Sequence, residues 1–109
     1  KKIIVVRTRH RAYRKDLSKR GTVKFVKMKY NKYPNFIKSL SDSNRVYNEQ
    51  CDKMAELHDR GEIFMLSPSE PVNIGRFEGN LDTLKNLYEL GYNDAKNNLD
   101  AINKYLESK

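Results

Sequence analysis

The segment Ile63-Phe64-Met65-Leu66 is a continuous apolar run that lies between Gly61 and Pro68. A short run of this kind, bounded by turn residues and without polar alternation, is typical of a strand covered on both faces, as in a parallel sheet. Ile3-Ile4-Val5-Val6 is a second such run. Helical patterns separate the two runs, and strands joined by helices nearly always form a right-handed parallel crossover. The sequence therefore predicts an α/β fold in the order strand, basic loop, helices, strand, helices, with two parallel strands under a helical cover.

The region after the first run is almost wholly polar from Arg7 to Arg20. We expect an extended loop there, with Tyr13 and Leu17 as its large apolar anchors. Residues 22–30 fit either a strand or a helix, and a stripe at helical spacing favours the helix; the stripe consists of Val23, Val26 and Tyr30.

Proline in the first turn favours a helix that begins at Pro34. Ser41-Asp42-Ser43 offers N-cap residues for a second helix that runs to about Arg60. Gly61 is expected to end that helix as the residue after its cap. One face of the helix is predicted from the spacing of Tyr47, Cys51, Met54 and His58.

Two further helices are expected after the second strand. Asn80 is the predicted N-cap of the first, and Gly91 is expected to end or bend it. The apolar face of the first contains Leu81, Leu84, Leu87 and Tyr88, and that of the second contains Tyr92, Ala95, Leu99, Ile102 and Leu106.

The length of 109 residues fits one domain over residues 1–109, with a strand and basic loop in 1–32 and a helical part with the second strand in 33–109. Two strands are too few for an independent sheet. Either the chain forms a homodimer, or its sheet continues in sequence outside these residues. No apolar run is long enough to span a membrane, and the single cysteine fits a reducing compartment, so a cytoplasmic location is expected.

Charge is distributed unevenly along the chain. Residues 1–40 contain 14 Lys and Arg residues and one acid, whereas residues 41–109 contain 8 Lys and Arg residues and 13 acids. The basic part either pairs with the chain's own acids, such as Glu78, Asp82 and Glu89, or faces an anionic membrane, or binds nucleic acid. No known nucleic-acid motif supports the last reading. The residues expected to contact anionic headgroups are Arg7, Arg9, Arg11, Arg14 and Lys15.

We predict no catalytic, cofactor-binding or metal-binding residue in this chain. No serine lies in a G-x-S-x-G elbow, and no G-x-x-x-x-G-K loop occurs. One cysteine and two distant histidines, His10 and His58, cannot form a structural zinc site. Cys51 and His58 are about 10 Å apart along a helix, too far for a nucleophile and its base, so Cys51 is expected to be a buried structural residue.

Several short motifs in order resemble the C-terminal region of bacterial patatin-like phospholipases. The first are IIVVRTR (Ile3–Arg9), YRK (Tyr13–Lys15), Tyr33-Pro34 and N-R-x-Y-N (Asn44–Asn48). The later ones are GEIFMLSPSEP (Gly61–Pro71), I-G-R-x-E (Ile74–Glu78) and L-Y-E-L-G-Y-x-D-A (Leu87–Ala95). Together they cover nearly the whole chain.

That resemblance implies a parent protein that hydrolyses lipid esters with a Ser-Asp dyad, without metal or organic cofactor. The serine of the family lies in G-x-S-x-G and the aspartate in D-G-[GA], and this chain contains neither motif. The resemblance therefore implies a catalytic domain before Lys1 as the partner of this chain. It also implies that residues 3–6 continue the sheet of that domain, and that the chain alone is inactive. The place of this chain would be peripheral at the inner face of the membrane.

Overall fold

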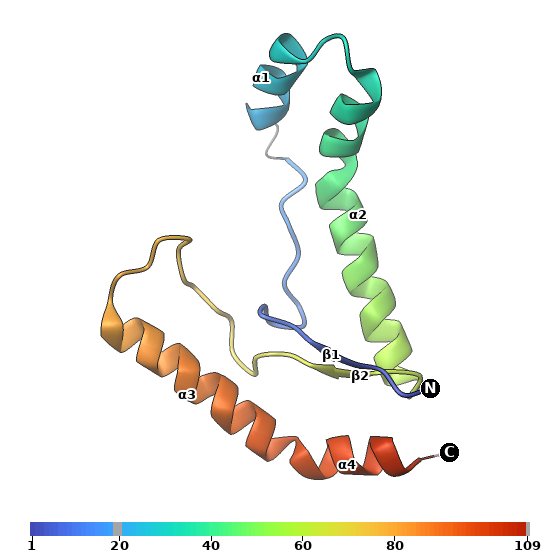
Figure 1. Cartoon of the computed structure of the whole chain (residues 1–109), viewed down its shortest axis with the longest axis vertical. Coiled ribbons are helices and arrows are strands. Elements are labelled where there is room, and N and C mark those ends of the chain that lie inside the picture. The colour runs from blue at the N-terminus through green and yellow to red at the C-terminus, as the bar shows by residue number, and fades with distance from the viewer. Residues whose placement is uncertain (19–20, 109) are drawn as a thin grey trace. The chain divides into compact units, whose positions relative to one another are not determined.

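A computed structural model describes residues 1–18 and 21–108 (Figure 1). Its elements, in chain order, are β1 (Ile4–Val6), α1 (Gly21–Lys29), α2 (Pro34–Asp59), β2 (Phe64–Leu66), α3 (Leu81–Asn97) and α4 (Leu99–Glu107). The chain forms two compact units. The sheet unit comprises Lys1–Tyr13 and Met54–Lys109, and the helical unit comprises Arg14–Lys53. One domain over residues 1–109, divided after residue 32, stays a prediction.

The two apolar runs form a parallel two-stranded sheet, as predicted. Ile4 is paired with Phe64, Val5 with Met65, and Val6 with Leu66. Hydrogen bonds extend the pairing at both ends, from Phe64 N–H to the Ile3 carbonyl oxygen at 2.9 Å and from Arg7 N–H to the Leu66 carbonyl oxygen at 2.8 Å. The mixed α/β class and the parallel strand pair are thereby confirmed.

The two strands differ in how well they are covered. Ile63, Phe64 and Met65 are buried, whereas Ile4 is 41% and Val6 is 71% exposed. β2 is therefore covered as expected, whereas the expected cover of β1 on both faces is absent among the described residues. The rings that pack on the sheet contact β2, since His58 and Tyr105 both lie against Phe64.

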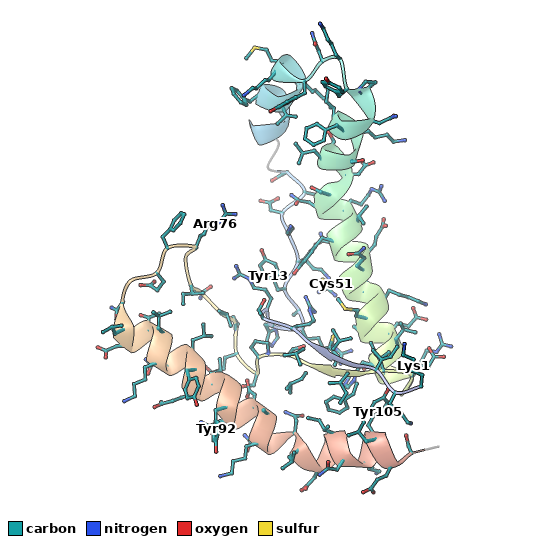
Figure 2. All side chains as sticks on the ribbon, in the orientation of Figure 1. Lys1, Tyr13, Cys51, Arg76, Tyr92 and Tyr105 are labelled. Atoms are coloured by element: carbon teal, nitrogen blue, oxygen red, sulfur yellow. The ribbon has the colours of Figure 1, made fainter. Side chains whose placement is uncertain are left out.

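Tyr105 on α4, which Figure 2 labels below the strands, bonds to the backbone just before both strands. Its hydroxyl accepts a hydrogen bond from Ile3 N–H at 3.0 Å and donates one to the Glu62 carbonyl oxygen at 3.2 Å. Its ring packs on Phe64 with centroids 5.9 Å apart, and the Lys2 ammonium lies 4.7 Å from its centroid. The buried hydroxyl is thus fully partnered, as a buried polar group requires.

Helix α2 is continuous from Pro34 to Asp59, so the predicted break and N-cap at Ser41-Asp42-Ser43 is wrong. The hydroxyl groups of Ser41 and Ser43 donate to the carbonyl oxygens of Ile37 and Leu40, each at 2.8 Å. Serine hydroxyls that bond back to the preceding turn are satisfied inside a helix and do not need to cap a new one. The predicted face of α2 is confirmed at its centre, where Cys51 is fully buried.

Gly61 ends α2 in the predicted way. Its φ of 74° lies in the left-handed region that favours glycine. Gly61 N–H donates to the His58 carbonyl oxygen and Glu62 N–H to the Leu57 carbonyl oxygen, both at 3.0 Å. This pair of bonds is a Schellman motif, which satisfies the last carbonyl groups of the helix and turns the chain into β2.

The polar segment after β1 has no helix or strand up to Ser18, as expected. Leu17 is exposed there, so its predicted role as an anchor is wrong. Lys19 and Arg20, the end of the predicted loop, lie outside the described residues. Helix α1 confirms the helical alternative for the next segment, and Tyr30 packs edge-on against Phe36 with centroids 5.5 Å apart.

Asn80 caps α3, since its side-chain oxygen accepts from Asp82 N–H at 2.9 Å and from Thr83 N–H at 3.3 Å. The helix passes through Gly91 and ends at Asn97, so the predicted end at Gly91 is wrong. The Asn98 N–H and side chain both donate to the Asp94 carbonyl oxygen, at 3.1 and 2.7 Å, and place the break there instead.

The inward faces of α3 and α4 also differ from the expectation. The predicted stripes are largely exposed, at Leu81, Leu84, Tyr88, Tyr92, Leu99 and Leu106. The buried residues are Asp94 and Tyr105, and both bond to the β2 strand or its flanks. The face that packs against the sheet is therefore the one that makes these polar contacts. Apolar periodicity does not predict such contacts.

No helix in the described part of the chain is long and apolar enough to cross a membrane.

Candidate functional site

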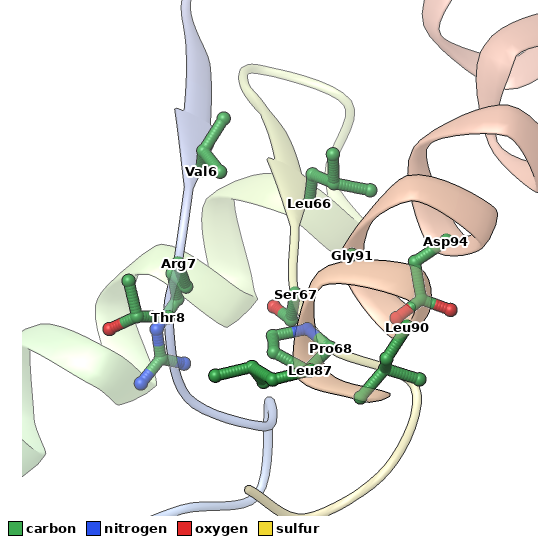
Figure 3. A pocket seen from close by; sticks show the side chains of 10 residues that line it. All are labelled: Val6, Arg7, Thr8, Leu66, Ser67, Pro68, Leu87, Leu90, Gly91 and Asp94. Atoms are coloured by element: carbon green, nitrogen blue, oxygen red, sulfur yellow. The ribbon is translucent and has the colours of Figure 1, made fainter. Parts of the chain in front are cut away.

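A cavity of about 230 Å³ lies where the two parallel strands end (Figure 3). Ligands of parallel sheets bind at this edge, beyond the carboxyl ends of the strands. Val6, Arg7 and Thr8 line the cavity from β1, and Leu66, Ser67 and Pro68 line it from β2. The remaining wall comes from α3, with Leu87, Leu90, Gly91 and Asp94. Most of these side chains are apolar, so the cavity suits an apolar group.

Four lining residues are polar, namely Arg7, Thr8, Ser67 and Asp94, and two of them, Ser67 and Asp94, contribute buried polar atoms. The Ser67 hydroxyl oxygen is buried and has no hydrogen-bond partner among residues 1–18 and 21–108. The Asp94 side chain is buried, and one of its carboxylate oxygens accepts from Ser69 N–H at 2.8 Å. Asp94 therefore holds the loop that follows β2, and this loop presents Ser67.

The arrangement does not form an activated nucleophile. A serine nucleophile needs a base within hydrogen-bond reach, and the Ser67 hydroxyl makes no such bond within the described residues.

The basic residues that follow β1 make contacts within the sheet unit. Arg7 donates to the Arg11 carbonyl oxygen at 3.4 Å. Arg9 donates to the Val72 carbonyl oxygen at 2.9 Å, and its guanidinium carbon lies 4.9 Å from the Tyr13 ring centroid. These contacts tie the loop after β1 to the segment after β2.

Arg11 forms an ion pair with Asp59 at the end of α2, with Nη2 and Oδ2 2.6 Å apart. The hydrogen bond from Arg11 lowers the pKa of Asp59, and the same bond to Asp59 raises the pKa of Arg11. Both side chains are exposed, and exposed pairs contribute little to stability.

Arg14 and Lys15 belong to the helical unit. Arg14 Nε and Nη2 both donate to Asp52 Oδ1, at 3.0 and 2.7 Å. The backbone of Lys15 exchanges two hydrogen bonds with the Asn48 side chain, and its ammonium lies 4.5 Å from the Tyr47 centroid. The basic loop thus pairs with Asp52 and Asp59 of α2, whereas Glu78 accepts from Asn80 N–H.

The five residues expected to contact headgroups are therefore divided between the units, with Arg7, Arg9 and Arg11 in one and Arg14 and Lys15 in the other. Their lipid contact stays a prediction. Arg7 and Ser67 each follow an apolar strand directly, which is the signal that places them at the edge where the cavity lies. Asp94 has no such signal, because in the sequence it resembles any other acid on a helix.

Both histidines accept hydrogen bonds from backbone N–H groups, and Cys51 is buried. His58 Nδ1 accepts from Met65 N–H at 3.1 Å, and its ring lies edge-on to Phe64 with centroids 5.3 Å apart. His10 Nδ1 accepts from Ala12 N–H at 3.1 Å within a turn. No group of three metal-ligating side chains occurs in the described ranges.

Comparison with known proteins gives one family. Residues 33–107, most of the chain, match "Domain of unknown function (DUF6363)". Neither a curated protein nor a solved structure matches the chain. The matched residues include α2, β2, α3 and α4 but not β1 or α1. The chain belongs to the DUF6363 family.

Proposed function

We propose that this chain is the non-catalytic C-terminal region of a bacterial patatin-like phospholipase, and that its strands extend the parallel sheet of the upstream catalytic domain. The proposal rests first on the ordered motifs from Ile3 to Ala95 that resemble this region of the family. The parent reaction would be hydrolysis of a lipid ester through an acyl-serine intermediate. The expected place is the cytoplasm, at the inner face of the membrane.

The observation that carries the proposal is the solvent exposure of the apolar side chains of β1. Its side chains are all apolar, yet Ile4 and Val6 are exposed. Such runs normally belong to strands covered on both faces, and two strands alone are marginal. A further parallel strand beside β1, with its own helical cover, would remove this exposure.

The boundary of the family match is compatible with the proposed docking of β2 onto a strand of another domain. β2 lies within the matched residues, whereas its partner β1 precedes them. Among the described residues, the strand partner of β2 lies outside the boundaries of the matched domain. Such pairing is what we expect of a domain that is appended to another. In this reading β1 belongs to the sheet of the preceding domain and β2 docks onto it.

The position of the cavity fits the same proposal. It lies at the carboxyl ends of β1 and β2, where an α/β hydrolase places its substrate. Its apolar walls would border the acyl site of the parent, and Arg7, Arg9 and Arg11 would lie at the rim and attract anionic headgroups.

Active-site labelling tests the proposed function. The full-length parent and the chain of residues 1–109 are each treated with a fluorophosphonate, and the mass increase is read by intact-protein mass spectrometry. We expect one label on the parent, at a serine in G-x-S-x-G before Lys1, with turnover of p-nitrophenyl esters. The chain alone should remain unlabelled. A parent that takes no label, or a label on Ser67, would contradict the proposal.

Neutral substitutions test the headgroup contact in the parent. The triple variant Arg7→Gln, Arg9→Gln, Arg11→Gln should bind anionic vesicles more weakly, because about 1 kcal/mol per basic residue near the surface is lost. The matched control is Arg45→Gln, Arg60→Gln, Arg76→Gln, which removes the same charge from three other exposed arginines. Equal binding by the two variants would remove this part of the proposal.

A further inference from the structure

The segment Lys24–Lys38 of the helical unit presents large apolar side chains to solvent. It contains the second half of α1, the connection to α2 and the first turn of α2. Phe25 is 59%, Met28 is 74% and Tyr33 is 63% exposed. We call the exposed side chains of residues 24–38 the lysine-aromatic surface.

The charge of this surface has one sign. Its basic residues are Lys24, Lys27, Lys29, Lys32 and Lys38, and no acid lies between Asp16 and Asp42. None of these lysines forms an ion pair within the described ranges, although Lys29 lies over the Tyr30 ring at 5.6 Å. Arg14, by contrast, is paired with Asp52. The positive charge of the lysine-aromatic surface is therefore available to a partner.

The apolar and basic side chains are arranged together on α1. Phe25 and Met28 are three residues apart and share one face of the helix. At about 100° per residue, Lys24 and Lys29 lie about 70° to either side of the centre of that face. Lysines in this position can extend their ammonium groups to headgroup phosphates while the apolar pair enters the bilayer interface.

Local contacts join α1 to the first turn of α2. Tyr33 N–H donates to the Tyr30 carbonyl oxygen at 2.9 Å, and Ile37 N–H donates to the Tyr33 carbonyl oxygen at 3.2 Å. Tyr30 also packs edge-on against Phe36. Figure 1 shows the two helical segments joined by this short turn. The lysine-aromatic surface is thus one connected surface rather than two independent ones.

We propose that the lysine-aromatic surface binds the interface of an anionic lipid bilayer, with Phe25 and Met28 inserted and the lysines on the phosphates. Charge complementarity selects an anionic partner, and the exposed Met28 and Phe25 select one with an apolar interior. Single-stranded nucleic acid would use aromatic stacking, to which Met28 contributes no ring. This inference is independent of the phospholipase proposal, because it concerns other residues and requires no catalytic domain.

Vesicle co-sedimentation of the 109-residue chain tests the lysines. Binding to phosphatidylcholine vesicles that contain phosphatidylglycerol should exceed binding to pure phosphatidylcholine and should weaken as salt is raised. Lys24→Glu, Lys29→Glu should lower partitioning by on the order of 25-fold, at about fivefold per lysine. The control Lys85→Glu, Lys96→Glu changes the net charge equally and should lower it by less than about fivefold. Equal losses in the two variants would overturn the proposal.

A fluorescence experiment tests the apolar pair without relying on a loss of binding. The chain contains no tryptophan, so Phe25→Trp introduces a single reporter. Its emission should shift to the blue on addition of phosphatidylglycerol vesicles and should be quenched by brominated acyl chains. Leu81→Trp, at an exposed apolar position on α3, should show neither change. Emission from position 25 that stays unshifted in the presence of the vesicles would overturn insertion.

A single-stranded oligonucleotide serves as the competing ligand. Vesicle binding that persists in excess oligonucleotide, and that Phe25→Ser, Met28→Ser weakens on the order of tenfold, supports the bilayer. Binding to the oligonucleotide without binding to anionic vesicles would overturn the proposal in favour of nucleic acid.

Discussion

The hydroxyl of Tyr105 accepts a hydrogen bond from the backbone N–H of Ile3 at 3.0 Å, across 102 positions of sequence. The same hydroxyl donates to the Glu62 carbonyl oxygen, directly before the buried run of β2. One side chain of α4 therefore bonds to the residues that precede both strands.

Removal of this hydroxyl should be costly. Tyr105→Phe keeps the ring on Phe64 but leaves Ile3 N–H and the Glu62 carbonyl without their partner, so we expect the free energy of unfolding to fall by about 1–3 kcal/mol. Urea denaturation followed by circular dichroism measures it. The control Tyr88→Phe removes a hydroxyl from an exposed tyrosine and should change it by less than about 0.5 kcal/mol. Similar losses for the two variants would show that the Tyr105 bonds do not stabilise the fold.

The glycine at the end of α2 gives a second prediction. Gly61→Ala places a Cβ in the left-handed region, so stability should fall by about 1–2 kcal/mol. A Cβ there would meet nothing within 4 Å, so the loss comes from backbone conformation and not from a clash. Gly75→Ala, where φ is not positive and space is also open, is the matched control. Thermal unfolding compares the two, and an unchanged midpoint for Gly61→Ala would contradict the Schellman end.

The substitution Gly91→Ala should have the opposite effect on stability. Gly91 lies within the continuous helix α3, and a Cβ there would meet open space. Alanine in a helix is about 0.5–1 kcal/mol more favourable than glycine, so Gly91→Ala should raise the unfolding midpoint. Destabilisation would indicate that the helix is broken at this residue after all.

The Arg11–Asp59 pair predicts a pH dependence. The pKa of Asp59 lies below its usual range because Arg11 donates to it. The pair therefore stabilises the fold above pH about 4, the usual aspartate range, and this contribution disappears as the pH falls through the lowered pKa. The difference in unfolding free energy between the native chain and Arg11→Met should shrink on acidification, and it should be small at any pH because both groups are exposed. Arg76→Met is the control, and a difference that grows as the pH falls would contradict the assignment.

Features that depend on neighbouring residues were predicted from the sequence. The apolar runs predicted the two strands, and Asn80 predicted a helix cap because its side chain reaches the N–H groups of the next turn. Gly61 predicted a helix end because glycine readily adopts the positive φ that such an end requires. The N-cap at Ser41-Asp42-Ser43 failed because serine side chains can satisfy themselves within a helix as well as at its start. Composition alone does not distinguish the two.

Long-range contacts decided the rest. The buried residue of α4 is Tyr105, which bonds to residues that precede both strands, whereas apolar spacing favoured Leu99 and Leu106. The cavity depends on Asp94 holding the backbone of Ser69, a contact between positions 25 residues apart. Such pairs lack a local sequence signature, so the sequence did not predict that Asp94 lies at the cavity.

Amide hydrogen exchange at the outer edge of β1 tests the central claim most directly. Ile3 C=O and Arg7 N–H bond to β2, so the alternation of a parallel strand turns the N–H groups of Ile4 and Val6 to the other edge. In the 109-residue chain these two amides should exchange freely while Arg7 N–H is protected. In the full-length parent we predict protection of Ile4 and Val6 by on the order of 1,000-fold, because the next strand of the catalytic sheet accepts their hydrogen bonds. Free exchange of both amides in the parent would show that no further strand pairs with β1 and would contradict the account.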